Sequence, residues 1–408
     1  MRSVAENIVR EAIEQNLPGP AVRSALKGLR QPRGRLVLVA IGKAAWAMAR
    51  AASDLLGDSL DEGIVITKYG HVEGAIERVV CREAGHPVVD AASVAATREA
   101  EELVRELGAD DTVLFLVSGG GSALFEDPAI PLAELSSITH QLLACGASIE
   151  EINTVRKHLS RVKGGRFGEL CAPAQVVVVA LSDVLGDRLD TIASGPAYPD
   201  ASTSAEALDV VRQYDLTLSA EALAALREET PKELSNAEMH VTGSVRALVS
   251  SAAEACVARG YKTVVLTSSL DCEAREAGAF LGAIARDHAA DGCKMAFVLG
   301  GETVVHLRGD GLGGRNQELA LAAAPAIAGL SNVCVVSVGS DGTDGPTDAA
   351  GGYVDGFTVE ALAKQGISVT DALDRSDSYH ALAACNGLVK TGPTGTNVND
   401  VAVVLVGQ

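Results

Sequence analysis

The sequence predicts an α/β protein in which helices alternate with mostly parallel strands. Short apolar runs rich in β-branched residues recur along the chain, and segments rich in Ala, Leu and Glu with helical periodicity separate them. Only 3% of the residues are aromatic although 47% are hydrophobic, so the core is expected to consist mainly of Val, Leu, Ala and Ile. A chain of 408 residues is too long for one ordinary core, and two domains are therefore expected.

Continuous apolar runs without polar alternation are typical of strands that are covered on both faces of a parallel sheet. The sequence predicts strands at Leu36–Ile41, Gly63–Thr67, Thr112–Val117, Val176–Leu181, Thr263–Thr267, Met295–Leu299, Val333–Val338 and Val401–Val406. Apolar residues at helical spacing predict helices at Ala44–Leu56, Ala91–Leu107, Leu132–Cys145, Ser244–Arg259 and Ala274–Asp287. Each domain is therefore expected to be Rossmann-like, with helices on both faces of its sheet.

The stretch Leu226–Glu238 is charged and contains no apolar run, which is typical of a linker between domains. Residues 1–235 are therefore expected to form an N-terminal α/β domain and residues 236–408 a C-terminal α/β domain. Two such domains would enclose a cleft. Ligands of open α/β sheets bind where the loops after the strands converge, so polar loops after strands are the first place to look for a site.

The balance of charges excludes some classes of partner. A formal net charge of −19 opposes binding to nucleic acids and to anionic membranes, because both require a basic surface. Residues 1–16 have an amphipathic, charged helical pattern, and no apolar run reaches the ~18 residues that a membrane span needs. The eight cysteines form no C-x-x-C pair. These features predict a soluble, cytoplasmic protein with reduced thiols.

The most specific local signal is the loop from Ser118 to Ser122, which places Gly119, Gly120 and Gly121 between two serines directly after a predicted strand. Glycine permits positive φ angles, so successive N–H groups can point into one concavity. A helix that begins directly after the loop would favour the same negative charge through its dipole. The loop therefore predicts a phosphate or carboxylate site; a tight turn without a ligand is the alternative.

Two cations follow predicted strands elsewhere in the chain. Lys43 lies beside a glycine between a predicted strand and a predicted helix, where a lysine can direct its charge toward a bound phosphate. A solvated surface lysine is the alternative. Arg315 follows a glycine-rich lead and begins an Ala/Leu helix, so it could stabilise a transferring phosphoryl group or bind a substrate carboxylate. Glu302 and Asn316 adjoin the same loops and are candidate ligand-binding residues.

Residues 153–166 form the most basic stretch of the chain, with five arginines and lysines within 11 residues. On a helix Asn153 and Arg156 share one face, and Lys163 follows near the helix end. In an acidic chain such a cluster indicates a surface that faces an anion. A plain helix end before two glycines explains Lys163 equally well.

Two groups of aspartates lie in loops that follow predicted strands. Asp183 and Asp187 follow Val176–Leu181, and a carboxylate at a strand end suits Mg²⁺, which binds one or two carboxylates together with substrate phosphates. Asp341 lies in the glycine-rich loop after Val333–Val338 and could bind Mg²⁺ or a substrate hydroxyl. Helix capping and turn formation are the alternatives for both groups.

Two nucleotide-binding fingerprints are missing from the sequence. No predicted strand is followed by G-x-x-x-x-G-K-[ST], or by G-x-G-x-x-G with an acidic residue about 20 positions later. Their absence weakens the interpretation as a dehydrogenase.

Taken together, the loops resemble one known family. The stretches that carry the resemblance are Ile41–Ala44, Ala84–Pro87, Val117–Ala123, Asn153–Ser160, Ser182–Asp187, Ala193–Pro196, Gly313–Glu318 and Ser340–Gly345. Their order resembles that of the class II glycerate 2-kinases, whose C-terminal region is called the MOFRL domain, and the resemblance covers nearly the whole chain. One minor departure is Leu185, where many relatives have a smaller or polar residue.

The resemblance implies ATP- and Mg²⁺-dependent phosphorylation of the 2-hydroxyl of D-glycerate in a cleft between two α/β domains. It marks Lys43 and Arg315 as catalytic, because the matching residues are regarded as the key active-site cations of the family. We expect Asp187 or Asp341 to accept the hydroxyl proton and Asp183 to bind Mg²⁺. The enzyme is expected to act on small molecules as a monomer or homodimer.

The residues expected to bind substrate or phosphate are Ser118, Gly119, Gly120, Gly121, Ser122, Asn153, Arg156, Lys163, Glu302 and Asn316. Two alternative functions stay open at this point. One is an NAD(P)H-dependent hydroxypyruvate reductase, a label that several members of the family carry. The other is a protein that binds a small anion without turnover.

Overall fold

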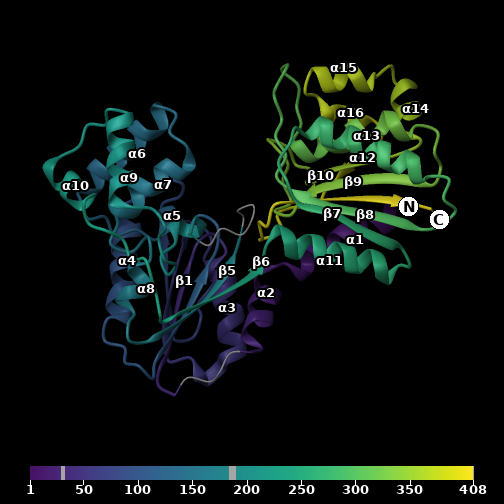
Figure 1. Cartoon of the computed structure of the whole chain (residues 1–408). Coiled ribbons are helices and arrows are strands. Elements are labelled where there is room, and N and C mark those ends of the chain that lie inside the picture. The colour runs from purple at the N-terminus through teal and green to yellow at the C-terminus, as the bar shows by residue number, and fades with distance from the viewer. Residues whose placement is uncertain (29–32, 183–189, 408) are drawn as a thin grey trace. The chain divides into compact units, whose positions relative to one another are not determined.

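The computed structural model describes residues 1–28, 33–182 and 190–407 of the chain (Figure 1). They form two compact units, and each unit is built around a six-stranded sheet. The first unit comprises residues 21–28, 33–182 and 190–242, and the second joins residues 1–20 to residues 243–407. None of the described helices combines the length and the apolar character that crossing a membrane requires.

The first sheet has the strand order β3-β2-β1-β4-β5-β6. Its strands are β1 (Leu36–Ile41), β2 (Glu62–Lys68), β3 (Val79–Ala84), β4 (Thr112–Val117), β5 (Gln175–Leu181) and β6 (Ala237–Gly243). The pairs from β3 to β5 are all parallel, which confirms the expected arrangement for this unit. Every residue of β1 and β4 is buried, as their continuous apolar sequences predict.

Helices cover both faces of the first sheet. They are α2 (Pro18–Leu26), α3 (Ala45–Leu56), α4 (Ala91–Val104), α5 (Gly121–Leu124) and α8 (Arg166–Leu170), with 3-10 turns at Gly57–Ser59 and Ile192–Ser194. The helices α6 (Leu132–Ala144), α7 (Ile149–His158), α9 (Ser204–Gln213) and α10 (Ala220–Ala225) share a separate core cluster that contains no strand residue. Leu38 of β1 packs with Met48 of α3 in one core cluster. Phe115 of β4 packs against the rings of Phe125 and Phe167.

The second sheet is mixed, which corrects the expectation that both sheets are mostly parallel. Its order is β11-β10-β9-β12-β8-β7, and its strands are β7 (Lys262–Leu270), β8 (Met295–Gly301), β9 (Val333–Gly339), β10 (Gly351–Asp355), β11 (Leu388–Val389) and β12 (Asp400–Val406). β7 and β8 pair in parallel, whereas the other pairs are antiparallel. β10 and β12 each follow the preceding strand through a loop without a crossover helix, so the chain returns in the opposite direction.

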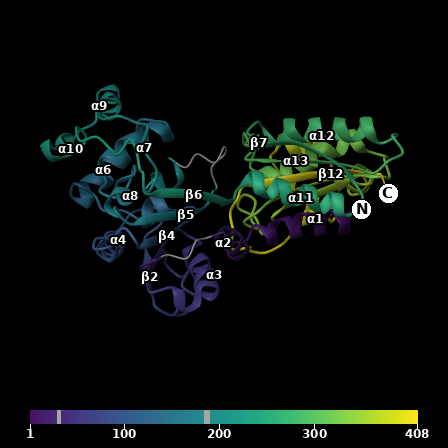
Figure 2. The ribbon, with the colours of Figure 1, turned by 60° about the horizontal axis from the view of Figure 1, so that its bottom comes forward.

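Helices also cover both faces of the second sheet, with α1 (Arg2–Gln15) and α11 (Val245–Ala258) on one face and α12 (Ala274–His288) and α13 (Arg315–Ile327) on the other (Figure 2). Three shorter helices complete the unit: α14 (Thr358–Ala363), α15 (Val369–Asp374) and α16 (Ser378–Ala384). Ile8 of α1 joins a core cluster with Leu248 and Val336. The N-terminal helix therefore belongs to the second unit, whereas the sequence-based division assigns it to residues 1–235.

The strands and helices predicted from the sequence are all present, but four strands were missed. β3 has alternating exposure and carries Arg82 and Glu83, and β10 begins with two glycines, so neither has the continuous apolar pattern of a buried strand. β11 has only two residues. β6 begins inside the predicted linker, and the two units meet in sequence between Thr242 and Gly243 instead of between residues 235 and 236.

Candidate active site

The first candidate site lies at the carboxyl end of β4, where the loop from Ser118 to Ser122 leaves the sheet. Gly120 has φ 86°, a left-handed value that favours glycine, and it directly precedes α5. α5 extends only from Gly121 to Leu124, so the helix dipole that the sequence suggested amounts to one turn. An anion at this loop must therefore be held mainly by individual N–H groups and side chains.

Lys43 is held beside this loop by the turn that follows β1. Gly42 has φ 109°, and a Cβ atom at its position would lie 2.3 Å from Ser118 Oγ, so only glycine fits there. The Lys43 amide donates to the Gly119 carbonyl at 2.9 Å, and the Ala44 amide donates to Ser118 Oγ at 3.1 Å. β1 and β4 are neighbouring parallel strands, which is why two loops far apart in sequence meet here.

The loop keeps several hydrogen-bond donors open to a ligand. Within the described part of the chain, the amides of Gly119, Gly120 and Ser122 donate to no protein acceptor, and the Lys43 ammonium pairs with no carboxylate. All four residues are partly exposed. A Cβ at Gly120 would lie 3.2 Å from Lys43 Cγ, which places the lysine side chain against the loop. Backbone amides and an ammonium in this arrangement can bind phosphate or carboxylate oxygens.

The His86 side chain is a further group beside the glycine loop. A Cβ at Gly120 would lie 3.0 Å from His86 Nε2, so the imidazole also lies against the loop. Partial burial and the nearby charges of Lys43, Lys68 and His71 lower the pKa of His86, which is therefore mainly neutral at pH 7. His86 lies in the stretch Ala84–Pro87 that carries the family resemblance, but no role was predicted for its side chain.

Two side chains from elsewhere in the first unit, Ser194 and Arg156, contact the loop at Ser122, and Asn153 is linked to it through Ser194. Ser122 Oγ and Ser194 Oγ share a hydrogen bond of 3.0 Å, and Ser194 donates to Asn153 Oδ1 at 3.3 Å. Arg156 Nη2 donates to the Ser122 carbonyl at 2.9 Å. Asn153 and Arg156 both lie on α7, as the basic stretch predicted, and the structure brings them to the glycine loop.

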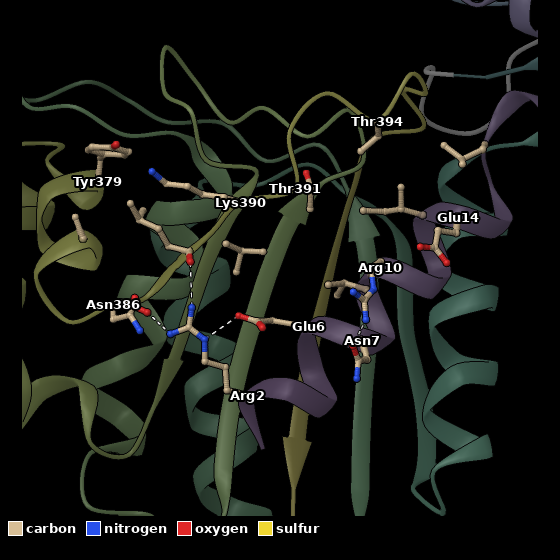
Figure 3. A pocket seen from close by; sticks show the side chains of 16 residues that line it. Arg2, Glu6, Asn7, Arg10, Glu14, Tyr379, Asn386, Lys390, Thr391 and Thr394 are labelled. Atoms are coloured by element: carbon tan, nitrogen blue, oxygen red, sulfur yellow. Dashed lines mark hydrogen bonds and ion pairs between the residues drawn. The ribbon is translucent and has the colours of Figure 1, made fainter.

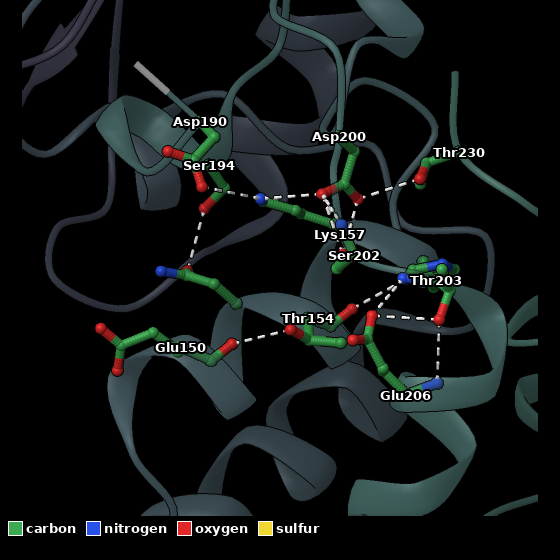
Figure 4. Close-up of polar contacts among 12 residues, drawn as sticks. Glu150, Thr154, Lys157, Asp190, Ser194, Asp200, Ser202, Thr203, Glu206 and Thr230 are labelled. Carbon is green, nitrogen blue, oxygen red and sulfur yellow. Dashed lines mark hydrogen bonds and ion pairs between the residues drawn. The ribbon is translucent and has the colours of Figure 1, made fainter. Parts of the chain in front are cut away.

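Two lysines of the same basic stretch are buried in ion pairs. Lys157 Nζ lies 3.0 Å from Asp200 Oδ1 (Figure 4). Lys163 is fully buried, lies 2.9 Å from Glu126 Oε2 and donates to the Phe125 carbonyl at 2.6 Å. Lys163 thus stabilises Phe125 and Glu126, directly after α5, from inside the protein. Its ammonium does not reach the surface on which a ligand would bind. The prediction that Lys163 binds substrate or phosphate is therefore corrected, because the residue is buried. The spacing of residues in the sequence does not reveal this burial.

The second candidate site lies in the second unit, where the end of β8 meets the beginning of β12. Arg315 begins α13, and its Nε and Nη2 donate to the two carboxylate oxygens of Asp400 at 2.6 and 3.1 Å. Its Nη1 donates to Glu302 Oε1 at 2.7 Å. β8 and β12 are antiparallel neighbours with Asp400 opposite Gly301, so both acids reach the same edge of the sheet. Arg315 and Glu302 were predicted from the sequence, whereas Asp400 was not.

Burial and pairing shift the pKa values of this cluster. Burial opposes the charge of Arg315, but hydrogen bonds and charge interactions with Asp400 and Glu302 outweigh it and raise the pKa of Arg315. Burial raises the pKa of Asp400 to about 6, against the opposing effect of Arg315. The Arg315 side chain is 33% exposed, so its charged guanidinium can still reach a ligand.

Asn316 has a structural position at the beginning of α13. Its amide and that of Gln317 donate to the buried carboxylate of Asp344, which caps the helix. Asn316 Oδ1 accepts from Ser337 Oγ at 2.6 Å, and the side chain is almost completely buried. The structure therefore places Asn316 next to Arg315 but turns its side chain into the protein, away from a ligand.

Two of the predicted aspartates, Asp183 and Asp187, lie outside the described residues. Among the residues that the structure does describe, no group of three or more His, Cys, Asp or Glu side chains is placed to hold a metal ion. Asp341 is partly exposed, and its Oδ1 accepts the Thr343 amide at 2.9 Å within its own loop. This contact fixes the carboxylate while leaving its second oxygen for another partner.

A groove of about 860 Å³ lies in the second unit between α1 and the segment around β11 (Figure 3). Arg2 of α1 is held there by Glu6 at 2.7 Å and by the carbonyls of Asn386 and Leu388. None of the residues predicted to bind a ligand lines this groove. Its best-defined contacts fasten α1 to the edge of the second sheet.

Comparison with known proteins identifies the family to which these loops belong. Residues 4–227 match a family described as a domain of unknown function (DUF4147), and residues 295–400 match the MOFRL family. A D-glycerate 2-kinase from Thermotoga maritima is 51% identical over 412 residues, covering 100% of this chain and 98% of that protein. The chain belongs to the glycerate kinase family. A glycerate 2-kinase from Pyrococcus horikoshii is 39% identical, covering 100% of this chain and 97% of that protein.

A solved glycerate kinase structure agrees with the fold described above. The crystal structure of the Thermotoga maritima glycerate kinase has a TM-score of 0.94 and 50% identity, with 99% of each chain covered. This likeness confirms the resemblance inferred from the sequence and the α/β class.

Proposed function

We propose that this protein is a glycerate 2-kinase that transfers the γ-phosphoryl group of ATP to the 2-hydroxyl of D-glycerate in the presence of Mg²⁺, giving 2-phosphoglycerate and ADP. The observation that supports it best is the glycine loop, where three amides and the Lys43 ammonium have no protein partner in the described structure. A chain with a net charge of −19 must concentrate its donors locally to bind an anion. The named relatives support D-glycerate as the acceptor.

The proposed roles follow from the chemistry of the open donors. The amides of Gly119, Gly120 and Ser122 would bind phosphoryl or carboxylate oxygens, and Lys43 would neutralise their charge. Arg315 would stabilise negative charge on the transferred group. Phosphoryl transfer requires mainly positioning and charge stabilisation, which amides and cations provide. Bound Mg²⁺-ATP would supply the phosphoryl group together with a metal that neutralises its oxygens.

Asp341 is the described candidate for the group that accepts the hydroxyl proton, because its carboxylate is held by one oxygen and is partly exposed. Asp187 remains the alternative base and Asp183 the proposed Mg²⁺ ligand. The eight cysteines are free thiols, which fits a reducing compartment. We therefore place the enzyme in the cytoplasm, as a monomer or homodimer.

The decisive experiment is to incubate the protein with D-glycerate and Mg²⁺-ATP, follow ADP release and identify the phosphorylated product by phosphorus NMR. We expect 2-phosphoglycerate. If 3-phosphoglycerate forms instead, the assigned hydroxyl is wrong. Oxidation of NAD(P)H with hydroxypyruvate would favour the reductase, and thermal stabilisation by ATP or glycerate without ADP release would favour a binding protein.

Replacing Lys43 by Met tests the central residue of the proposal. We expect kcat to fall by about 10²–10³-fold, because a charge that stabilises the transferred group is lost. The thermal midpoint should stay unchanged, since the ammonium has no protein partner in the described structure. Lys364→Met is the matched control, because that lysine is 71% exposed in a surface pair with Glu360. Near-normal turnover in Lys43→Met would remove this residue from the mechanism.

A further inference from the structure

Asp400 and Glu302 hold the same guanidinium in different ways. We propose that Asp400 is a positioning residue that fixes the orientation of Arg315, whereas Glu302 is an exchangeable partner whose place a bound phosphate takes. The inference rests on the proposed function in identifying this phosphate with the transferred group. The binding of an anion to Arg315 can be measured without turnover, so the two proposals fail separately.

Asp400 binds the guanidinium with both of its oxygens. Arg315 Nε lies 2.6 Å from Oδ2 and Nη2 lies 3.1 Å from Oδ1, which is the paired geometry that gives arginine–carboxylate contacts their strength and direction. The Asp400 side chain is only 10% exposed. Separating this pair would leave a buried carboxylate without its partner, which is strongly unfavourable. Asp400 therefore stays on Arg315 when a ligand arrives.

Glu302 makes a single contact with Arg315 and is much more exposed. Its Oε1 accepts from Nη1 at 2.7 Å, and the side chain is 44% exposed. Its other oxygen, Oε2, accepts from Asn399 Nδ2 at 3.1 Å. When the contact with Arg315 opens, water can solvate Oε1 and Asn399 can keep the carboxylate in place. An exposed contact of this kind contributes little net stability, so another anion can replace it.

The donors that remain on Arg315 define where the anion binds. A guanidinium has five N–H donors, and the contacts with Asp400 use those on Nε and Nη2 while the contact with Glu302 uses one on Nη1. The remaining donors lie on Nη1 and Nη2, the nitrogens that form the fork for bidentate phosphate binding. A phosphate on this fork shares Nη1 with the Glu302 carboxylate, and the repulsion between the two anions displaces the more exposed Glu302 while the Asp400 contact stays intact.

Two isosteric substitutions separate the roles. Asp400→Asn and Glu302→Gln each remove one negative charge beside Arg315, so a purely electrostatic effect would tighten anion binding in both variants. If Asp400 positions Arg315 and Glu302 exchanges with the anion, the two substitutions should change the Kd in opposite directions. We expect Glu302→Gln to lower the Kd for inorganic pyrophosphate by about three- to tenfold, and Asp400→Asn to raise it by about tenfold, measured by calorimetry without nucleotide or glycerate.

The controls come from the same unit. Asp348→Asn removes a carboxylate from an exposed pair with Lys390 at 2.7 Å, and it should leave the pyrophosphate affinity unchanged. In an Arg315→Met background, neither Asp400→Asn nor Glu302→Gln should change this affinity. If Asp400→Asn does not fold, Asp400→Glu keeps the charge but moves the carboxylate, and it should still weaken pyrophosphate binding.

Turnover gives a second, independent readout. Asp400→Asn should lower kcat by about 100-fold, because a misoriented guanidinium no longer stabilises the transition state. Its effect on KM for D-glycerate should be smaller, as expected for a residue that acts through Arg315. The inference would be overturned if Asp400→Asn and Glu302→Gln changed the Kd for pyrophosphate in the same direction, or if the wild type bound no pyrophosphate. A protein that binds pyrophosphate as described but releases no ADP would overturn only the proposed function.

Discussion

Three lysines of the first unit show how one type of side chain takes different roles. Lys157 and Lys163 are buried in ion pairs with Asp200 and Glu126, because an ammonium buried without a partner is strongly unfavourable. Lys43 is partly exposed, and within the described structure no carboxylate pairs with it. Of the three, Lys43 is the one whose charge is available to a ligand.

The candidate site was partly predictable from the sequence. Lys43 and the glycine loop directly follow apolar strands, and the carboxyl ends of parallel strands lie at one edge of a sheet. Asp400 could not be found in this way, because it begins a strand that is antiparallel to β8. Arg315 and Asp400 are 85 positions apart, so no local pattern connects them. The burial of Lys163 could not be predicted from the sequence either, because it depends on how α7 and the following turn pack.

Glu101, a buried residue of α4, gives a pH-dependent prediction. Burial and the charge of Asp127 raise the pKa of Glu101 from 4.5 to about 7. Between these values the folded state binds the proton more tightly than the unfolded state, so this residue makes the protein less stable as the pH rises through that window. We expect the stability advantage of Glu101→Gln to grow by about 2 kcal/mol between pH 5 and pH 8.

Urea unfolding of the wild type and Glu101→Gln at each pH measures this difference. Glu102→Gln is the control, because the neighbouring residue is exposed. A constant difference between Glu101→Gln and the wild type across the pH range would contradict the assigned pKa.

At the scale of elements, the connections between strands determine the strand directions, which the apolar runs do not. The strands of the second unit were predicted from their composition, but their directions were not. Loops without a crossover helix lead into β10 and β12, and both strands run antiparallel to their neighbours. This reversal brings the start of β12 to the end of β8, and it thereby places Asp400 beside Glu302.

The conformation of the loop before α5 depends on one glycine, Gly120. Gly120 has φ 86°, and a Cβ there would lie 2.9 Å from His86 Cδ2 and 3.2 Å from Lys43 Cγ. Gly120→Ala should destabilise the protein by about 1–2 kcal/mol through backbone strain and should also displace both side chains. We expect kcat/KM for D-glycerate to fall by about tenfold or more.

Gly146→Ala is a matched control for the strain alone. Gly146 has φ 75°, and a Cβ at its position would meet nothing within 4 Å. Its thermal midpoint should fall by an amount similar to that of Gly120→Ala, while its kcat/KM should stay near that of the wild type. Equal activity of the two variants would show that the contacts around Gly120 do not matter for catalysis.

At the scale of the whole molecule, the N-terminal helix belongs to the unit that is distant from it in sequence. Ile8 and Val9 of α1 are buried in the core cluster of the second unit. Asn16, just after the helix, donates to Ser251 Oγ at 3.0 Å, and its carbonyl accepts from Thr396 Oγ1 at 3.0 Å. The second unit is therefore built from both ends of the chain.

Shortening Ile8 tests this assignment. Ile8→Ala should lower the free energy of unfolding by about 2–4 kcal/mol, because it leaves a cavity in a buried cluster. Hydrogen exchange should become faster in β12 and remain unchanged in β1. Val22→Ala, in the core cluster of the first unit, should show the reverse pattern. Faster exchange in β1 alone after Ile8→Ala would contradict the assignment of α1.

The sequence by itself determined the α/β class, the positions of the central strands and the loops that carry Lys43, the three glycines and Arg315. It could do so because apolar periodicity and glycine chemistry act over a few neighbouring residues. The tertiary structure alone decided the strand directions of the second sheet, the unit to which α1 belongs, the burial of Lys163 and the pairing of Arg315 with Asp400. These features depend on contacts between distant segments, which no local pattern encodes.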